Sequence, residues 1–193
     1  MSIVSNLDDS ITRWNEDNTT SGVPLTIVLD MDETLVHSTE EGTVPEDGDF
    51  MVLGYAVRKR PYLEVFLNYL LGDPDYEVGI WTAGTHDYAH GILDNIVHDK
   101  SVFSFIMTRE NCDQNRNKPL FRIKDKYGYN IHAHDILIID DKDGVTCHHH
   151  LNHLKIKEFE GDMDDTELYE LMQFLEENRD RPSEYYVCNW RIK

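Results

Sequence analysis

Carboxylate and hydroxyl side chains follow three apolar runs of the sequence, at the points where those runs end. They are Asp30, Asp32 and Thr34 after the first run, Thr82 after the second, and Asp140 with Asp141 at the end of the third. Carboxylates a few ångströms apart repel one another or take up protons, and a hard divalent cation with oxygen ligands relieves that repulsion. If the three runs meet, these acids therefore predict a Mg²⁺ site.

A carboxylate beside Mg²⁺ can attack a phosphorus atom, because the cation screens the charges of the nucleophile and of the phosphoryl oxygens. A second carboxyl two residues further on can protonate the leaving oxygen and then activate the water that hydrolyses the aspartyl phosphate. Neighbouring hydroxyl and ammonium groups can hold the other phosphoryl oxygens. Acids after strands are also common as helix caps and turn formers. The combination of DxDxT, a later Thr and an Asp-Asp pair favours phosphoryl transfer.

Short apolar runs that alternate with amphipathic segments predict the elements that hold these side chains. We expect strands at 24–29, 76–82, 103–107, 135–140 and 153–159, and helices at 61–72, 86–98 and 164–178. Residues 38–49 are expected to form a loop, and 50–57 a strand that is one arm of a hairpin. The alternation predicts an α/β fold with a parallel sheet covered on both faces, in which ligands bind at the carboxyl ends of the strands.

The composition limits the function classes. The chain has 193 residues, with 18 basic and 37 acidic side chains and a formal net charge of −19. This charge argues against general nucleic-acid binding and against binding to an anionic membrane. We expect no membrane span and no secretory signal, and free cysteine thiols in a reducing compartment. The basic clusters 58–60 and 109–126 are expected to form a rim around the acidic centre.

The chain resembles the haloacid dehalogenase superfamily, and within it the FCP/SCP-type phosphatases of the RNA polymerase II C-terminal domain. The stretches that carry the resemblance are LDMDETLVHS (29–38), RKRPYLEVFL (58–67), WTAGTHDYAH (81–90), FSFIMTRENC (103–112), IKDKYG (123–128), ILIIDDKDGV (136–145) and DDTELYELMQFLEE (164–177). The resemblance implies a Rossmann-like fold with a central parallel sheet flanked by helices, a small hairpin-type insertion and no large cap. We expect a helical extension at 1–20, the phosphatase domain at 21–180 and a tail at 181–193 packed on it.

Carried over residue by residue, the resemblance implies a role for each site residue. Asp30 matches the nucleophile and Asp32 the general acid/base. Both match Mg²⁺ ligands, Asp32 through its backbone carbonyl, together with Asp140 and Asp141; which member of that pair ligates directly stays open. Lys124 matches the phosphate-binding lysine, with Lys118 as the alternative. Thr34 and Thr82 match hydroxyls at the phosphate, Arg109 matches an arginine near the substrate entrance, and Tyr88 matches one position of a pocket for a substrate proline.

The resemblance implies a Mg²⁺-dependent phosphatase for phosphoserine or phosphothreonine that works through an aspartyl phosphate. The RNA polymerase II C-terminal domain is one candidate substrate, although Thr85 and Glu40 replace a leucine and a phenylalanine of the proline pocket. Alternatives are a small-molecule or nucleic-acid-end phosphatase of the same fold, or a non-catalytic binding module. The expected partner is a phosphorylated protein or peptide, without a membrane or general nucleic-acid partner. We expect a monomer in the nucleus or cytoplasm.

Overall fold

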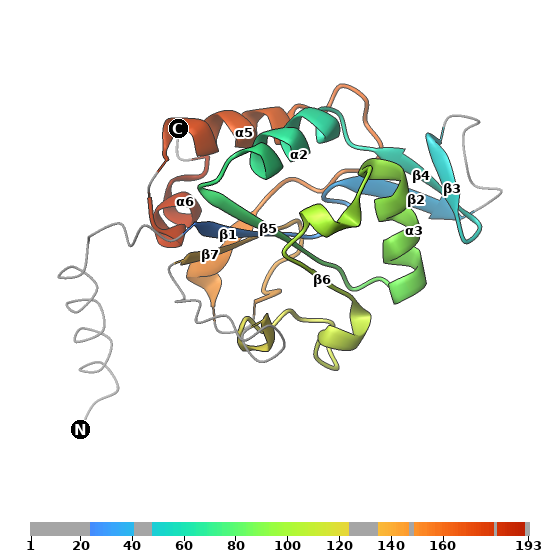
Figure 1. Cartoon of the computed structure of the whole chain (residues 1–193), viewed down its shortest axis with the longest axis horizontal. Helices are drawn as coiled ribbons and strands as arrows, with labels where there is room; N and C mark the ends of the chain where they lie inside the picture. The colour runs from blue at the N-terminus through green and yellow to red at the C-terminus, as the bar shows by residue number, and fades with distance from the viewer. Residues whose placement is uncertain (1–23, 41–47, 124–134, 147–148, 180, 192–193) are drawn as a thin grey trace.

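The computed structural model describes residues 24–40, 48–123, 135–146, 149–179 and 181–191. The expected N-terminal helix, residues 41–47 of the expected loop at 38–49 and Lys124 lie outside these ranges. A parallel sheet with strand order β6-β5-β1-β7-β8 forms the centre (Figure 1). Its strands are β1 (Leu25–Leu29), β5 (Tyr76–Trp81), β6 (Phe105–Met107), β7 (Ile136–Asp140) and β8 (His153–Lys155). The predicted α/β fold with a central parallel sheet is therefore confirmed.

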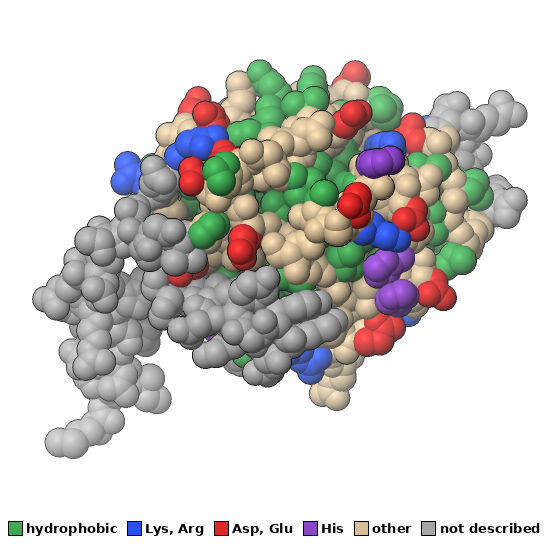
Figure 2. All heavy atoms as spheres, viewed as in Figure 1, with side chains coloured by type: hydrophobic (Ala, Val, Ile, Leu, Met, Phe, Trp, Pro, Cys, Tyr) green, Lys and Arg blue, Asp and Glu red, His purple; other side chains and the backbone are tan. Residues whose placement is uncertain are grey.

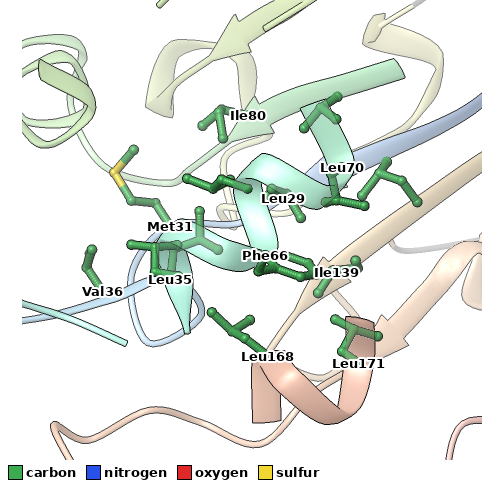
Figure 3. Close-up of a cluster of buried hydrophobic side chains, with 14 of the residues drawn as sticks. Leu29, Met31, Leu35, Val36, Phe66, Leu70, Ile80, Ile139, Leu168 and Leu171 are labelled. Carbon is green, nitrogen blue, oxygen red and sulfur yellow. The ribbon is translucent and has the colours of Figure 1, made fainter. Parts of the chain in front are cut away.

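The central strands are apolar throughout because both of their faces are buried. Along β1, Ile27 and Leu29 join one hydrophobic cluster, whereas Val28 joins a second cluster on the opposite face. Helices α2 (Leu63–Gly72) and α5 (Glu167–Glu177) cover the first face. In Figure 3, Phe66 of α2 lies between the sheet and Leu168 of α5. The second cluster contains Trp81 and apolar residues of segment 112–123. Burying these side chains is the main source of stability for the fold.

A small antiparallel sheet follows β1 and makes up the insertion. It has the order β2-β4-β3, with β2 (Val36–Glu40), β3 (Phe50–Val52) and β4 (Tyr55–Lys59). The expectation of a loop from residue 38 was wrong, because Ser38 to Glu40 pair with β4. The expected single strand at 50–57 is also wrong, since Leu53 and Gly54 turn the chain with φ angles of 50° and 84°. Two successive positive φ angles are the geometry of a tight hairpin turn.

Two further helices pack at the ends of the sheet. Helix α3 (His86–Ile96) lies against the small sheet, where Gly91 meets the side chain of Val52. A Cβ at Gly91 would lie 2.6 Å from Val52 Cγ1, so only glycine allows this approach. Helix α6 (Ser183–Asn189) buries Tyr186, whose hydroxyl donates to the Asn178 carbonyl. The proposed domain boundaries at 20 and 180 stay predictions.

Three short 3₁₀ helices complete the described elements: η1 (Lys100–Val102), η2 (Arg109–Asn111) and η4 (His150–Asn152). Among the described residues, no helix has both the length and the apolar character needed to cross a bilayer.

Candidate active site

The strand register brings the predicted acids to one edge of the central sheet. Leu29 of β1 pairs with Ile139 of β7, and the Asp30 amide donates to the Ile139 carbonyl at 3.0 Å. Asp30 therefore lies beside Asp140 at the carboxyl ends of two neighbouring parallel strands. This edge is where α/β sheets bind their ligands.

Asp30, Asp140 and Asp141 form one compact acidic cluster. Each offers a carboxylate oxygen within 4.8 Å of the others, and each residue is buried. Burial raises the pKa of Asp30, and Asp140 adds to that rise; burial and Asp140 likewise raise the pKa of Asp141. The site thus holds more negative charge than its surroundings compensate. Hard oxygen donors with uncompensated charge fit a divalent cation, so these three residues could hold a metal ion.

Among the described residues, Lys118 is the lysine whose ammonium group contacts this cluster. Its ammonium group donates to Asp30 Oδ1 at 2.5 Å and to Asp140 Oδ2 at 2.6 Å. The side chain is buried, which by itself would lower its pKa, but the two carboxylates raise the pKa above its ordinary value. Lys118 therefore stays charged between the two acids.

The loop before Lys118 is held by side-chain hydrogen bonds. The Asp113 carboxylate accepts from the amides of Asn115 and Asn117 and from the Asn117 side chain, and the Lys118 amide donates to the Val145 carbonyl at 2.7 Å. The family resemblance favoured Lys124 through its spacing to Asp140, with Lys118 as the alternative. The turn-forming Asp and Asn residues at 113–117 are the sequence feature that marks the loop holding Lys118. Such residues form turns through their own side chains.

Asp32 lies outside the acidic cluster and has its own partners. The Tyr88 hydroxyl donates to Asp32 Oδ1 at 2.5 Å, and the Thr82 hydroxyl donates to Oδ2 at 3.3 Å. The Tyr88 oxygen also lies 2.6 Å from Ser38 Oγ of β2. Burial, followed by the charge of Asp32, raises the pKa of Tyr88. Ser38 was missed at the sequence level, because it stood in a segment expected to be loop.

Arg60 is a buried side chain that stabilises the turn carrying Asp30 and Asp32. Arg60 is 1% exposed and donates to both carboxylate oxygens of Asp165, at 2.8 and 2.9 Å, and to the Thr34 carbonyl at 3.1 Å. The prediction that Arg60 belongs to an exposed basic rim was therefore wrong. Thr34 itself is fully buried, with its hydroxyl 3.4 Å from Asp141 Oδ1.

The end of β5 supplies Thr82 and a tight turn. The Thr82 hydroxyl accepts from the Gly84 amide at 2.9 Å. Arg109 joins this turn: its amide donates to the Gly84 carbonyl at 2.9 Å, and its Nε donates to the Ala83 carbonyl at 2.8 Å. Arg109 is exposed. The fold thus brings together Asp30, Asp32, Thr34, Thr82, Tyr88, Arg109, Asp140 and Asp141 from the predicted set, together with Lys118.

The face of the molecule that includes α3 carries mixed charges. Figure 2 shows acidic, basic and histidine side chains side by side over this region, and no broad basic area appears among the side chains coloured there. This surface accords with the strongly acidic net charge.

Three relatives by sequence are named as phosphatases or as a nuclear envelope protein. "Nuclear envelope morphology protein 1" of Schizosaccharomyces pombe is 31% identical over 78% of this chain and 32% of its own length. "CTD nuclear envelope phosphatase 1B" of Danio rerio is 27% identical over 78% of this chain and 65% of its own, and "CTD small phosphatase-like protein" of Homo sapiens is 29% identical over 78% and 54%. The chain spans about a third to two thirds of the length of these relatives.

The fold and the sequence family agree. A structure of a variant of the fission yeast RNA polymerase II CTD phosphatase Fcp1, bound to beryllium fluoride, matches with a TM-score of 0.57 at 21% identity, over 79% of this chain and 45% of that chain. The family model described as "NLI interacting factor-like phosphatase" matches residues 25–184, well over half of the chain. The protein therefore belongs to the NLI interacting factor-like phosphatase family.

Proposed function

We propose that this chain is a Mg²⁺-dependent phosphoprotein phosphatase that hydrolyses phosphoserine or phosphothreonine through an aspartyl phosphate on Asp30. One observation carries the proposal: Asp30 shares a buried site with Lys118, Asp140 and Asp141, whereas Asp32 stands beside them with separate hydrogen bonds. Two carboxyl groups in such different surroundings suit two different tasks.

In the first step, a carboxylate oxygen of Asp30 attacks the phosphorus atom and the bond to the leaving oxygen breaks. The leaving oxygen takes a proton from the Asp32 carboxyl, so that an alcohol departs. Lys118 and the Thr82 hydroxyl are placed to hold phosphoryl oxygens, since Lys118 touches Asp30 and Thr82 touches Asp32. Fixed positive charge at this point stabilises the negative charge of the transferring group.

In the second step, the Asp32 carboxylate takes a proton from a water molecule while the water oxygen attacks the phosphorus. The bond between phosphorus and Asp30 breaks, which releases inorganic phosphate and restores both carboxyl groups. Thr34 is completely buried against Asp141, so we assign it to supporting that carboxylate rather than to contact with phosphate.

Asp30, Asp140 and Asp141 would hold the divalent cation, with the Asp32 carbonyl as a further candidate ligand. When bound, Mg²⁺ would offset the charge of these acids and of the phosphoryl oxygens. Oxygen-only donors favour Mg²⁺ over softer metals. The surplus of buried carboxylates over Lys118 supports this assignment.

A phosphorylated side chain of a protein or peptide is the substrate class that we propose. The described insertion beside the site is the small sheet, and the described residues form no large cap, so the site can admit a chain. The relatives named as CTD phosphatases support a repeat peptide of RNA polymerase II as one substrate. Exposed Arg109 at the β5 turn is placed to meet the phosphate or its neighbours. We propose that the protein works as a monomer in the nucleus or cytoplasm.

Hydrolysis of 4-nitrophenyl phosphate tests the reaction. The full chain should lose activity with a chelator, regain it with MgCl₂, and lose it in Asp30→Asn. Full activity of Asp30→Asn would refute the mechanism. Phosphoserine and phosphothreonine peptides should be better substrates than nucleotides or 5′-phosphorylated DNA, and the opposite order would refute the substrate class. Trifluoroberyllate with Mg²⁺ should bind at Asp30.

A further inference from the structure

We propose that Tyr88 is a positioning residue for Asp32: its hydroxyl, which also contacts Ser38, occupies one oxygen of the Asp32 carboxyl and leaves the other oxygen free to face the leaving group. The inference rests on the proposed function, because it assigns a second residue to the proton transfer of the same site. It differs from the role that the family resemblance implied for Tyr88, which was contact with a substrate proline.

The contacts of Asp32 are unequal. Tyr88 Oη lies 2.5 Å from Oδ1, which is a short hydrogen bond, whereas Thr82 Oγ1 lies 3.3 Å from Oδ2. Short bonds to a carboxylate are the strong ones, and a bond of 3.3 Å is weak. Oδ1 of Asp32 therefore accepts the strong hydrogen bond from the phenol. The proton that Asp32 gives to a leaving group is then carried by Oδ2.

The phenol has only one proton to give. Its oxygen lies within hydrogen-bond distance of Asp32 Oδ1 and also of Ser38 Oγ, at 2.6 Å. Because an unprotonated carboxyl oxygen can only accept, the Tyr88 proton points to Asp32 Oδ1, and Ser38 Oγ is the second group in contact with the phenol oxygen. Ser38 of β2 therefore lies against the Tyr88 oxygen, beside the carboxyl group.

The Tyr88 ring is held on two sides, which makes the hydroxyl a fixed reference point. The Tyr55 ring packs against it in a T-shaped arrangement, with ring centroids 5.7 Å apart. On another side lies Gly84, where an added Cβ would be 2.8 Å from Tyr88 Cδ1. A ring held this firmly can hold Asp32 in turn, as general acid catalysis requires a carboxyl group aimed at the leaving oxygen.

The test uses three esters whose leaving oxygens need a proton to different degrees: 4-nitrophenyl phosphate, phenyl phosphate and a phosphoserine peptide. The variants are Tyr88→Phe, which keeps the ring, and Ser38→Ala. Tyr69→Phe is the matched control, since its hydroxyl also donates to a carboxylate, Glu176, but lies on α2, away from the site. The value of kcat/KM is measured for each ester, because it reports the first phosphoryl transfer.

For Tyr88→Phe, we expect kcat/KM to fall about tenfold more for phenyl phosphate and the phosphoserine peptide than for 4-nitrophenyl phosphate. Ser38→Ala should change the ratio in the same direction by a smaller factor, and Tyr69→Phe should leave it unchanged. If Tyr88→Phe does not fold, Ser38→Ala alone carries the same comparison.

Three results would overturn the role of Tyr88. An equal loss for all three esters would mark a general structural effect. A rise in KM for the peptide alone, with both aryl esters unaffected, would mark substrate docking. Unchanged ratios in both site variants would exclude any effect on the proton. If neither the wild-type chain nor Asp30→Asn hydrolyses any ester, the proposed function fails and the role of Tyr88 falls with it; an active wild type with unchanged ratios refutes only the role of Tyr88.

Discussion

Replacing Lys118 by methionine removes the ammonium group from the acidic cluster while keeping an unbranched side chain. In the wild-type protein this group donates two short hydrogen bonds to Asp30 and Asp140, and it is buried. Removing one partner of a buried ion pair costs about 3–5 kcal/mol, because the other charge stays behind without compensation. A domain has about 5–15 kcal/mol of stability in total, so the effect should be large in urea unfolding without a cation.

Mg²⁺ should separate two consequences of the Lys118→Met change. The cluster becomes more negative, so the cation should bind more tightly and restore more stability to the variant than it adds to the wild type. Hydrolysis of 4-nitrophenyl phosphate should nevertheless fall about 10²–10³-fold at saturating Mg²⁺, because a fixed charge at the phosphoryl oxygens is missing. Mg²⁺ should therefore restore the stability of the Lys118→Met protein without restoring its activity.

Lys124→Met and Lys142→Met are the controls for this experiment. Lys124 is the other candidate from the sequence, and Lys142 is a mostly exposed lysine whose side chain lies 3.9 Å from Glu33. Both should lose far less activity than Lys118→Met. A larger loss of activity in Lys124→Met than in Lys118→Met would refute the assignment, and so would a Lys118→Met protein with unchanged stability and rate.

Other substitutions test the surroundings of the site. Arg60→Met should lower the free energy of unfolding by about 3–5 kcal/mol, because it leaves Asp165 buried without its partner. The double variant with Asp165→Leu should recover part of this stability. If it recovers none, the broken Arg60–Asp165 ion pair is not the cause of the loss. Burial of Asp165 raises its pKa, but hydrogen bonds from Arg60 outweigh burial and lower the pKa below its ordinary 3.8. The ionised Asp165 therefore adds to the free energy of unfolding above pH 3.8, and this contribution is lost as the pH falls through the lowered pKa. Urea unfolding of Arg60→Met at a series of pH values should not show this loss. In Gly84→Ala, the added Cβ would lie 2.8 Å from Tyr88 Cδ1 and should displace the Tyr88 ring. The rate of phenyl phosphate hydrolysis should fall about tenfold with little change in Tm. An unchanged rate would contradict the role of this contact. Gly79→Ala, with a Cβ 2.3 Å from Phe105, should cost about 1–3 kcal/mol by urea unfolding but keep the rate of folded protein, and a rate loss at unchanged stability would contradict this reading.

The central strands could be predicted closely because their signal is local. Strand β1 occupies Leu25–Leu29 within the predicted 24–29, and β7 occupies Ile136–Asp140 within 135–140. A strand buried on both faces must be apolar at every position, so its own residues reveal it. The acids just after these strands could be placed together for the same reason, since parallel strands end at a common edge.

The small sheet could not be predicted in this way. Strand β2 has only one buried residue, Val36, and its partner β4 lies about twenty positions further along the chain, so no local apolar run marks it. The hairpin turn is hidden as well, because Leu53 occupies a position with φ of 50° where asparagine, aspartate or glycine is usual. Because strand β2 was not predicted, Ser38 and its contact with Tyr88 were not predicted either.

Charges that are adjacent in the sequence separate in the folded protein, and this changes how the substrate can be recognised. Arg58, Lys59 and Arg60 appear as one basic cluster, yet Arg60 points into the interior and its charge is matched by Asp165. Lys118, which lies in the second basic cluster, is matched by Asp30 and Asp140. Arg60 and Lys118 thus form buried ion pairs, so neither can be part of an exposed basic rim. Long-range attraction of a phosphorylated chain then depends on exposed residues such as Arg109, against a net charge of −19, so specificity must come from short-range contacts at the phosphate.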